Sequence, residues 1–273
     1  MPIDQTAPTK AWVDALQALD DIEDPPREIL SWASGNWDDV STRLLGRLDE
    51  FAAGRRAAFS GAEAFTIVHF CGEKAETRVY PILCRLIGED RRIAEWLDDA
   101  VTETLPGILI RVFNGDSAPL RRAVESAKGD EFARASALAA LGYLVRAKGA
   151  MSDDDMRAYL MRIRQEAGPR RESVFWMTWV TTVANLGYSD MRSEVEALIR
   201  SGFFPEGDFT REEFDLRVAC ARSDASGLAG FRSDLVAPLE DASAAILSLV
   251  GAAANHAGRS LRTLARQKDH AHV

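Results

Sequence analysis

Three polar side chains around residue 100 have the spacing that acid-base or metal chemistry would use. Asp99, Thr102 and Glu103 stand at positions i, i+3 and i+4, so on a helix they share one face, with Asp98 at its margin. Paired carboxylates on one face bind a divalent metal or move protons if they are partly buried, because their repulsion makes one of them hold a proton. The alternative, which we favour, is a solvated helix start in which the carboxylates complement the helix dipole and Thr102 acts as a cap.

His69, Cys71 and Cys84 form the one set of soft metal ligands in the sequence. A zinc site uses three or four ligands at close, paired spacing. On a helix the side chains of His69 and Cys71 point about 200° apart, so they do not easily share one ion. We therefore interpret the thiols as core residues and the histidine as an interhelical one, and we expect no metal and no cofactor. The sequence also contains no Gly-x-Ser-x-Gly motif, phosphate-binding loop or dinucleotide fingerprint.

Aromatic residues are concentrated near position 176, where Trp176 and Trp179 stand one helical turn apart. Exposed tryptophans in a concave groove are natural anchors for a peptide or an apolar ligand. Arg170 and Arg171 precede them and are suited to bind acidic groups beside an aromatic platform. The alternative is that the tryptophans pack between helices while the arginines form a solvated basic face.

Arginine pairs suggest a third kind of site. They recur near predicted helix ends at Arg55 and Arg56, Arg91 and Arg92, and Arg121 and Arg122. If they were aligned along one ridge, they would form a basic stripe able to follow a nucleic acid. Because cations at helix ends complement the helix dipole without any ligand, we favour a structural role for them.

The overall charge restricts the partners of the chain. The 273 residues carry a net charge of −9, which repels phosphate backbones and anionic membrane surfaces. The longest uncharged run, residues 242–255, is about 14 residues long, which is too short to span a bilayer. The first 24 residues contain no apolar signal segment, and the three cysteines are an odd number. We therefore expect a cytoplasmic protein with reduced core thiols and no membrane partner, and the net charge argues against a nucleic-acid partner.

The elements that position these residues are helices separated by glycines. Six glycines, each after an apolar helical stretch, recur at intervals of roughly 34 to 43 residues: Gly35, Gly72, Gly115, Gly149, Gly187 and Gly227. Glycine adopts the left-handed conformation that ends a helix, so this spacing predicts a row of helical hairpins. The helices after the glycines have one apolar stripe, whereas those before them are apolar on more sides and should be flanked by more neighbours.

Local signals mark several helix ends. Ser152 with Asp155, and Thr210 with Glu213, match capping boxes or close variants of them. Pro106 lacks a backbone donor, so we expect a kink or a helix restart near it.

No stretch alternates apolar and polar residues as a strand would. We predict an all-α fold, a right-handed α-α superhelix in which helical hairpins form a solenoid of the HEAT or armadillo kind. Residues 1–227 would be the helical-repeat domain with an N-terminal capping helix, and residues 228–254 a C-terminal helical cap. Residues 255–273 would be a basic tail, weakly docked or flexible.

The stretch from His69 to Asp116 reads HFCGEKAETRVYPILCRLIGEDRRIAEWLDDAVTETLPGILIRVFNGD. It resembles a bacterial family catalogued as domain of unknown function 1186, and the resemblance extends from about residue 25 to residue 214. The family's Asp-x-x-Thr-Glu element falls on Asp99, Thr102 and Glu103, and its Gly-Asp turn on Gly115 and Asp116. The resemblance implies a HEAT-like or armadillo-like repeat and implies no particular chemistry.

These observations favour a scaffold without enzymatic activity that binds a protein or peptide partner along a concave face. The candidate binding residues are Trp176, Trp179, Asp99, Thr102, Glu103, Arg170 and Arg171. The main alternative is a metal-dependent hydrolase or lyase that uses Asp98, Asp99 and Glu103. A lower alternative is nucleic-acid binding through the arginine pairs. The sequence carries no signal for a particular oligomeric state.

Overall fold

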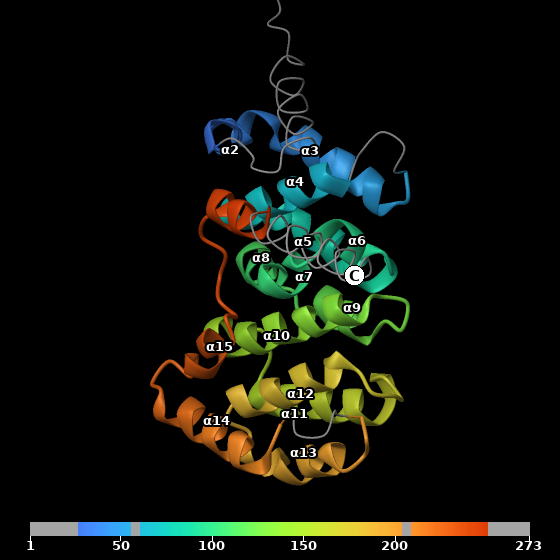
Figure 1. Ribbon diagram of the computed structural model, residues 1–273, viewed down its shortest axis with the longest axis vertical. Helices are drawn as coiled ribbons and strands as arrows, with labels where there is room; N and C mark the ends of the chain where they lie inside the picture. The colour runs from blue at the N-terminus through green and yellow to red at the C-terminus, as the bar shows by residue number, and fades with distance from the viewer. Residues whose placement is uncertain (1–26, 56–60, 204–208, 251–273) are drawn as a thin grey trace, which may run out of the picture.

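The computed structural model describes residues 27–55, 61–203 and 209–250, and this part of the chain is all-helical without a strand. The helices are stacked along the long axis of the molecule (Figure 1). The stack begins with α2 (Arg27–Gly35) and α3 (Trp37–Ala52) and ends with α13 (Arg192–Ile199) and α14 (Arg211–Ser223). The predicted all-α class is therefore confirmed.

The remaining helices lie between these ends, and α15, which follows α14 in the chain, lies beside α10 (Figure 1). They are α4 (Gly61–Glu73), α5 (Tyr80–Glu89), α6 (Ile93–Leu97), α7 (Ala100–Glu103), α8 (Leu105–Val112), α9 (Ala118–Glu125), α10 (Glu131–Lys148), α11 (Asp153–Arg162), α12 (Val174–Asn185) and α15 (Ala229–Ser233). Short helical turns at Thr77–Val79, Ile163–Ala167 and Ser189–Met191 connect some of them.

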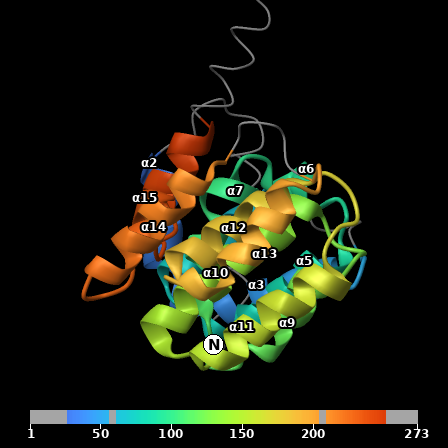
Figure 2. The ribbon, with the colours of Figure 1, turned by 90° about the horizontal axis from the view of Figure 1, so that it is seen from below.

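The helices form two layers. In the inner layer, α4, α8, α10, α12 and α14 each contact the next. The outer layer contains α3, α5, α9 and α11, and along the stack these lie on the side opposite α14 and α15 (Figure 2). The inner helix α10 is buried along most of its length, whereas the outer helix α9 buries only the stripe of Leu120, Ala123 and Val124. The layers thus follow the apolar pattern of each helix.

Tyrosine hydroxyls connect successive parts of the stack. Tyr80 donates to the carbonyl of Asp116, and Tyr159 donates to the carbonyl of Arg121, over 3.0 and 3.2 Å. Tyr188 donates to Oδ1 of Asp153 over 2.8 Å. The partners are 35 to 38 positions apart in the sequence. Burial raises the pKa of each phenol, so all three remain donors.

Four of the six predicted glycine turns are confirmed. Gly115, Gly149, Gly187 and Gly227 all have positive φ. Gly35 and Gly72 do not have positive φ, so the prediction is wrong for these two positions. Gly72 lies inside α4, and a Cβ there would come 2.9 Å from the Leu239 side chain and 3.1 Å from Ile108. Gly72 therefore allows close packing inside the structure and does not form a turn.

The predicted helix starts are confirmed. The Ser152 hydroxyl accepts from the Asp155 amide, and the Thr210 hydroxyl accepts from the Glu213 amide. A new helix, α8, begins directly after α7 with Pro106 in its first turn. The first turn of a helix does not use its backbone N–H groups for bonds within the helix, so the lack of an N–H at Pro106 costs no hydrogen bond there.

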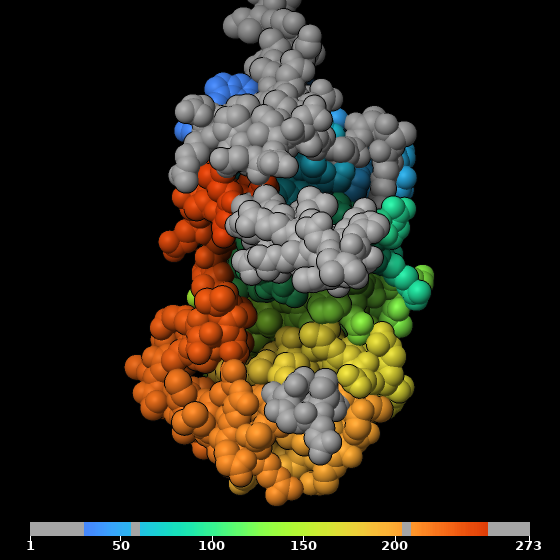
Figure 3. Space-filling model, in the orientation of Figure 1, coloured from blue at the N-terminus to red at the C-terminus, as the bar shows by residue number. Residues whose placement is uncertain are grey.

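After α15 the chain turns back along the stack, and we call residues 234–250 the strap. Its amide at Leu239 donates to the carbonyl of Gly107 in α8 over 3.2 Å. Its helix at residues 242–250 is capped by Glu73 of α4, whose Oε2 accepts from the Ala242 amide over 3.0 Å. The strap lies on one side of the face shown in Figure 3. The C-terminal segment thus covers the last helices through α15 and also reaches α8 and α4. The predicted N-terminal capping helix, which would occupy residues 9–21, and the predicted tail at residues 255–273 lie outside the described residues.

Gly107 is the position where the strap comes closest to the inner layer. A Cβ at this residue would lie 2.5 Å from the carbonyl oxygen of Ala237. We expect Gly107→Ala to lower the free energy of unfolding by about 1–3 kcal/mol, because backbone must move to admit the methyl group. Urea unfolding measures this change, and limited proteolysis shows whether residues 234–250 become accessible.

Gly46 in the middle of α3 is the matched control, since nothing lies within 4 Å of its Cβ position. Gly46→Ala should raise stability by about 0.5–1 kcal/mol through helix propensity. Equal effects of the two substitutions would contradict a close contact between the strap and α8.

Candidate functional site

A groove of about 460 Å³ lies between the inner helices α10 and α12 on one side and α14, α15 and the start of the strap on the other. It is lined by Thr102, Pro106, Phe132, Ala135, Ser136, Ala139, Val174, Met177, Thr178, Thr181, Thr182, Asn185, Phe209, Glu213, Arg217, Phe231, Asp234 and Val236. Along α10 these residues stand at i, i+3, i+4 and i+7, and α12 shows a similar spacing, so each helix presents one face. Small side chains such as Ala135, Ala139 and Thr181 leave the space open.

One end of the groove holds a polar network. Nη1 of Arg217 donates to both carboxylate oxygens of Asp234, over 2.7 and 2.8 Å. Nδ2 of Asn185 donates to the same carboxylate over 2.7 Å. Asn185 is 2% exposed, and a Cβ at Gly230 would lie 2.3 Å from its Oδ1. The network therefore ties α12 and α14 to the residue that follows α15.

The other end has two exposed apolar side chains, Phe132 at the start of α10 (42% exposed) and Val174 at the start of α12 (37% exposed). The two helix starts are held together by Ser173, whose hydroxyl donates to Oε2 of Glu131 over 2.5 Å. The groove thus runs from an apolar rim to a polar end. The groove is not among the sites predicted from the sequence, although the face of small residues on α10 is a signal that points to it.

The two tryptophans lie in the core. Trp176 and Trp179 are both 0% exposed, and their rings meet edge to face with centroids 6.4 Å apart. Nε1 of Trp179 donates to the carbonyl of Leu160, and Phe203 stacks on Trp176. The structure thus corresponds to the core-packing alternative, and neither ring can anchor a ligand at the surface.

The acidic cluster is open to solvent. Asp98, Asp99, Thr102 and Glu103 are all exposed, and the Thr102 hydroxyl donates to the Asp99 carbonyl. Thr102 also lines the groove, whereas the carboxylates do not. In the described part of the chain, no three His, Cys, Asp or Glu side chains are grouped so that they could hold a metal ion. The partly buried carboxylate pair that the hydrolase or lyase hypothesis needs is therefore not formed by these residues.

The arginines are divided among separate cavities. Arg170 and Arg171 line a cavity together with Arg91, whereas Arg121 and Arg122 each line a different one. The described members of the arginine pairs are therefore not gathered at one cavity. Arg56 lies outside the described residues.

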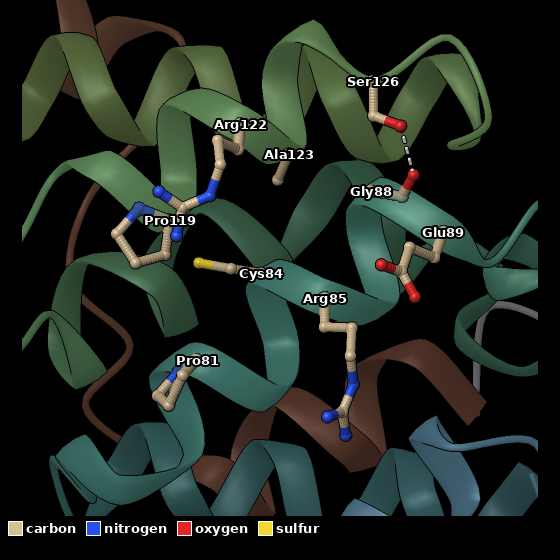
Figure 4. A pocket seen from close by; sticks show the side chains of 9 residues that line it. All are labelled: Pro81, Cys84, Arg85, Gly88, Glu89, Pro119, Arg122, Ala123 and Ser126. Atoms are coloured by element: carbon tan, nitrogen blue, oxygen red, sulfur yellow. Dashed lines mark hydrogen bonds between the residues drawn. The ribbon is translucent and has the colours of Figure 1, made fainter.

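The described residues His69, Cys71 and Cys84 are not arranged as a metal site. His69 is fully buried, with Nδ1 bonded to the carbonyl of Phe65 and Nε2 to the hydroxyl of Thr104. Burial raises the pKa of the Cys71 thiol, and it raises that of Cys84 to about 12. Cys84 lies in a crevice of about 340 Å³ between α5 and α9, near Arg122 (Figure 4). A thiol with this pKa is a poor nucleophile at neutral pH.

Cys220 differs from the expectation of a core thiol. It lies on the exposed side of α14, although it stands in an apolar stretch of sequence. The stripe of α14 that faces the core carries Phe214, Val218 and Ala221 instead.

These features define an all-helical protein with a groove between its inner helices. The family described as protein of unknown function (DUF1186) matches residues 67–224, which is more than half of the chain. The protein belongs to this family, which confirms the family predicted from the sequence, although the match begins at residue 67 and not near residue 25. No curated protein and no solved structure matches the chain. None of the described helices is long and apolar enough to cross a membrane.

His69 gives the stability a predictable pH dependence. Burial lowers its pKa from 6.5 to about 4, so between these values the unfolded chain binds the proton and the folded chain does not. The contribution of His69 to the free energy of unfolding is therefore fully present above pH 6.5 and is lost as the pH falls to about 4. It amounts to about 3 kcal/mol.

The test is urea unfolding of the wild type and of His69→Gln at several pH values across this window. We expect the free energy of unfolding of the wild type to fall more steeply with acid than that of the variant. Carboxylates titrate in both proteins, so the difference between the two curves reports His69. Parallel curves would contradict a buried, neutral histidine.

Proposed function

We propose that this protein is a helical-repeat scaffold, an α-α superhelix of the HEAT or armadillo kind, that binds a peptide segment of a protein partner in the groove between α10, α12 and α14. It would act in the cytoplasm, where buried thiols such as those of Cys71 and Cys84 stay reduced. The proposal assigns the protein no catalytic step.

The repeat character is supported by contacts at a constant sequence distance. Besides the tyrosine bonds, Arg85 pairs with Asp49 at a separation of 36, and Arg162 pairs with Glu125 at a separation of 37. The carbonyl of Gly88 accepts from Ser126, 38 positions away. Regular separations of this size are typical of stacked helical hairpins, in which each unit contacts the next.

The observation that carries the proposed binding is the apolar rim of the groove. Large apolar side chains are exposed at few places in the described residues: Trp32, Phe132, Val174, Leu216 and Leu235. Phe132 and Val174 meet at one cavity, at the starts of adjacent helices. Exposed apolar side chains that gather at a groove are typical of interaction sites, whereas isolated ones are common on any surface.

The lining of the groove fits a peptide better than a flat protein surface. Its small apolar side chains can receive the side chains of a peptide, and Thr178 and Thr181 place hydroxyl groups beside them. The Arg217 and Asp234 pair at the far end adds charged groups for the peptide backbone or its side chains. A helical groove that takes an apolar anchor and a few polar contacts is a common mode of peptide recognition.

The test is selection of a random peptide library on the full chain, followed by affinity measurement with the wild type and Phe132→Asp. We expect enriched peptides to carry an apolar anchor. Their affinity should fall about tenfold or more for Phe132→Asp, which corresponds to at least about 1.4 kcal/mol. The carboxylate would lie at the rim that receives the anchor.

Leu216→Asp is the matched control, because Leu216 is 71% exposed on α14 and does not line the groove. Peptide affinity should be unchanged for this variant. Enrichment no greater than on an unrelated protein, or equal loss of affinity for both variants, would refute peptide binding in this groove.

A further inference from the structure

A second cavity, of about 570 Å³, lies beside the starts of α10 and α12 and is lined by four arginines. We call it the arginine pocket. Its basic residues are Arg91, Arg134, Arg170 and Arg171, and its acidic residues are Asp130 and Glu131. Two of the predicted binding residues, Arg170 and Arg171, therefore belong to this pocket and not to the groove.

Arg134 is the buried member of the set. It is 6% exposed, and no described carboxylate forms an ion pair with it. Its Nε donates to the carbonyl of Val124 over 2.8 Å, Nη2 donates to the carbonyl of Ala167 over 3.4 Å, and the group lies over the Phe175 ring. Burial lowers the pKa of this guanidinium. A cation that is desolvated in this way gains from an anion that reaches it.

The other three arginines are held mainly by main-chain carbonyls. Arg91 donates to the carbonyls of Lys128 and Ala127, and Arg170 donates to that of Gln165. Arg171 donates to the carbonyl of Glu172 and also pairs with Glu131 over 3.3 Å. These bonds orient the side chains and leave most of their charge uncompensated.

The carboxylates of the pocket are already engaged. Oδ1 of Asp130 accepts from the amides of Phe132 and Ala133 and caps α10. Glu131 accepts from Ser173 and from Arg171. The lining thus holds four guanidinium groups and two carboxylates, an excess of two positive charges in a protein whose net charge is −9.

The wall of the pocket is tightly packed. A Cβ at Gly129 would lie 2.2 Å from the carbonyl oxygen of Ile87, and one at Gly168 would lie 2.3 Å from the Trp176 ring. No larger residue fits at either place without movement of the backbone or of a buried ring. The buried tryptophan therefore supports the wall that carries the arginines.

We propose that the arginine pocket binds a phosphorylated small molecule, with its phosphoryl group placed between the guanidinium groups. A phosphate monoester carries about −1.5 to −2 charges at neutral pH, which matches the excess of the pocket. Guanidinium groups bind phosphate oxygens through paired, charge-assisted hydrogen bonds. The volume lies in the range of small-molecule sites, about 300–1,000 Å³, and leaves room for an organic group.

The experiment is calorimetric titration of the full chain with three probes: inorganic phosphate, a nucleoside monophosphate and the dicarboxylate succinate. We expect the phosphate compounds to bind more tightly than succinate. Tighter binding of the nucleoside monophosphate would show that the pocket takes an organic phosphate, and equal binding of both would show that free phosphate is the ligand. Absence of binding by both phosphate probes at millimolar concentration would overturn the proposal.

Substitutions of its arginines test whether phosphate binds in the arginine pocket. Arg91→Gln and Arg170→Gln remove exposed guanidinium groups, so the fold should persist, and each should weaken phosphate binding roughly tenfold. Arg122→Gln is the matched control, since Arg122 is exposed but lines the crevice between α5 and α9. Its phosphate affinity should equal that of the wild type. Full affinity in Arg91→Gln and Arg170→Gln, or an equal loss in Arg122→Gln, would refute the assignment of phosphate to the arginine pocket.

Because the peptide selection uses another cavity and other variants, the two proposals fail independently.

Discussion

Contact between successive helices of the inner layer is the constraint on which the structure depends. α10 is apolar on almost all sides, so it needs α8 on one side and α12 on the other to remove it from water. On the outer side, the hydrogen bonds of Tyr80, Tyr159 and Tyr188 join segments on or next to α5, α9 and α11 at separations of 35 to 38 residues. Burial supplies most of the stabilisation, and the buried hydroxyls select which surfaces meet.

The features that the sequence predicts correctly are those that depend on residues close together in the chain. Helix class, the restart at Pro106, the caps at Ser152 and Thr210, and the glycine turns from Gly115 onward depend on residues within a few positions of each other. Gly72 was misjudged because its role depends on Leu239, far away in the chain. The same limit applied to Trp176, since helical spacing describes a buried and an exposed tryptophan equally well. The groove and the arginine pocket are assembled from several helices, so their geometry is not visible in any single segment.

The starts of α10 and α12 separate two chemically different surfaces. Glu131 and Ser173 join the two helices by a hydrogen bond, with Phe132 and Val174 on the groove side and Arg171 on the side of the arginine pocket. A shift of this junction would alter both cavities at once. The separation also shows why a net charge of −9 is a poor guide to local chemistry, because positive groups gather where main-chain carbonyls hold them.

The return of the strap has a consequence for how the chain acquires its structure. The helices can assemble in the order in which the ribosome releases them, because most of their polar contacts join residues fewer than about 45 positions apart. Glu73 instead caps a helix 169 positions later. Until synthesis reaches that point, the strap cannot cover α4 and α8 around Gly72 and Gly107, so the nascent chain presents these packing surfaces to other chains.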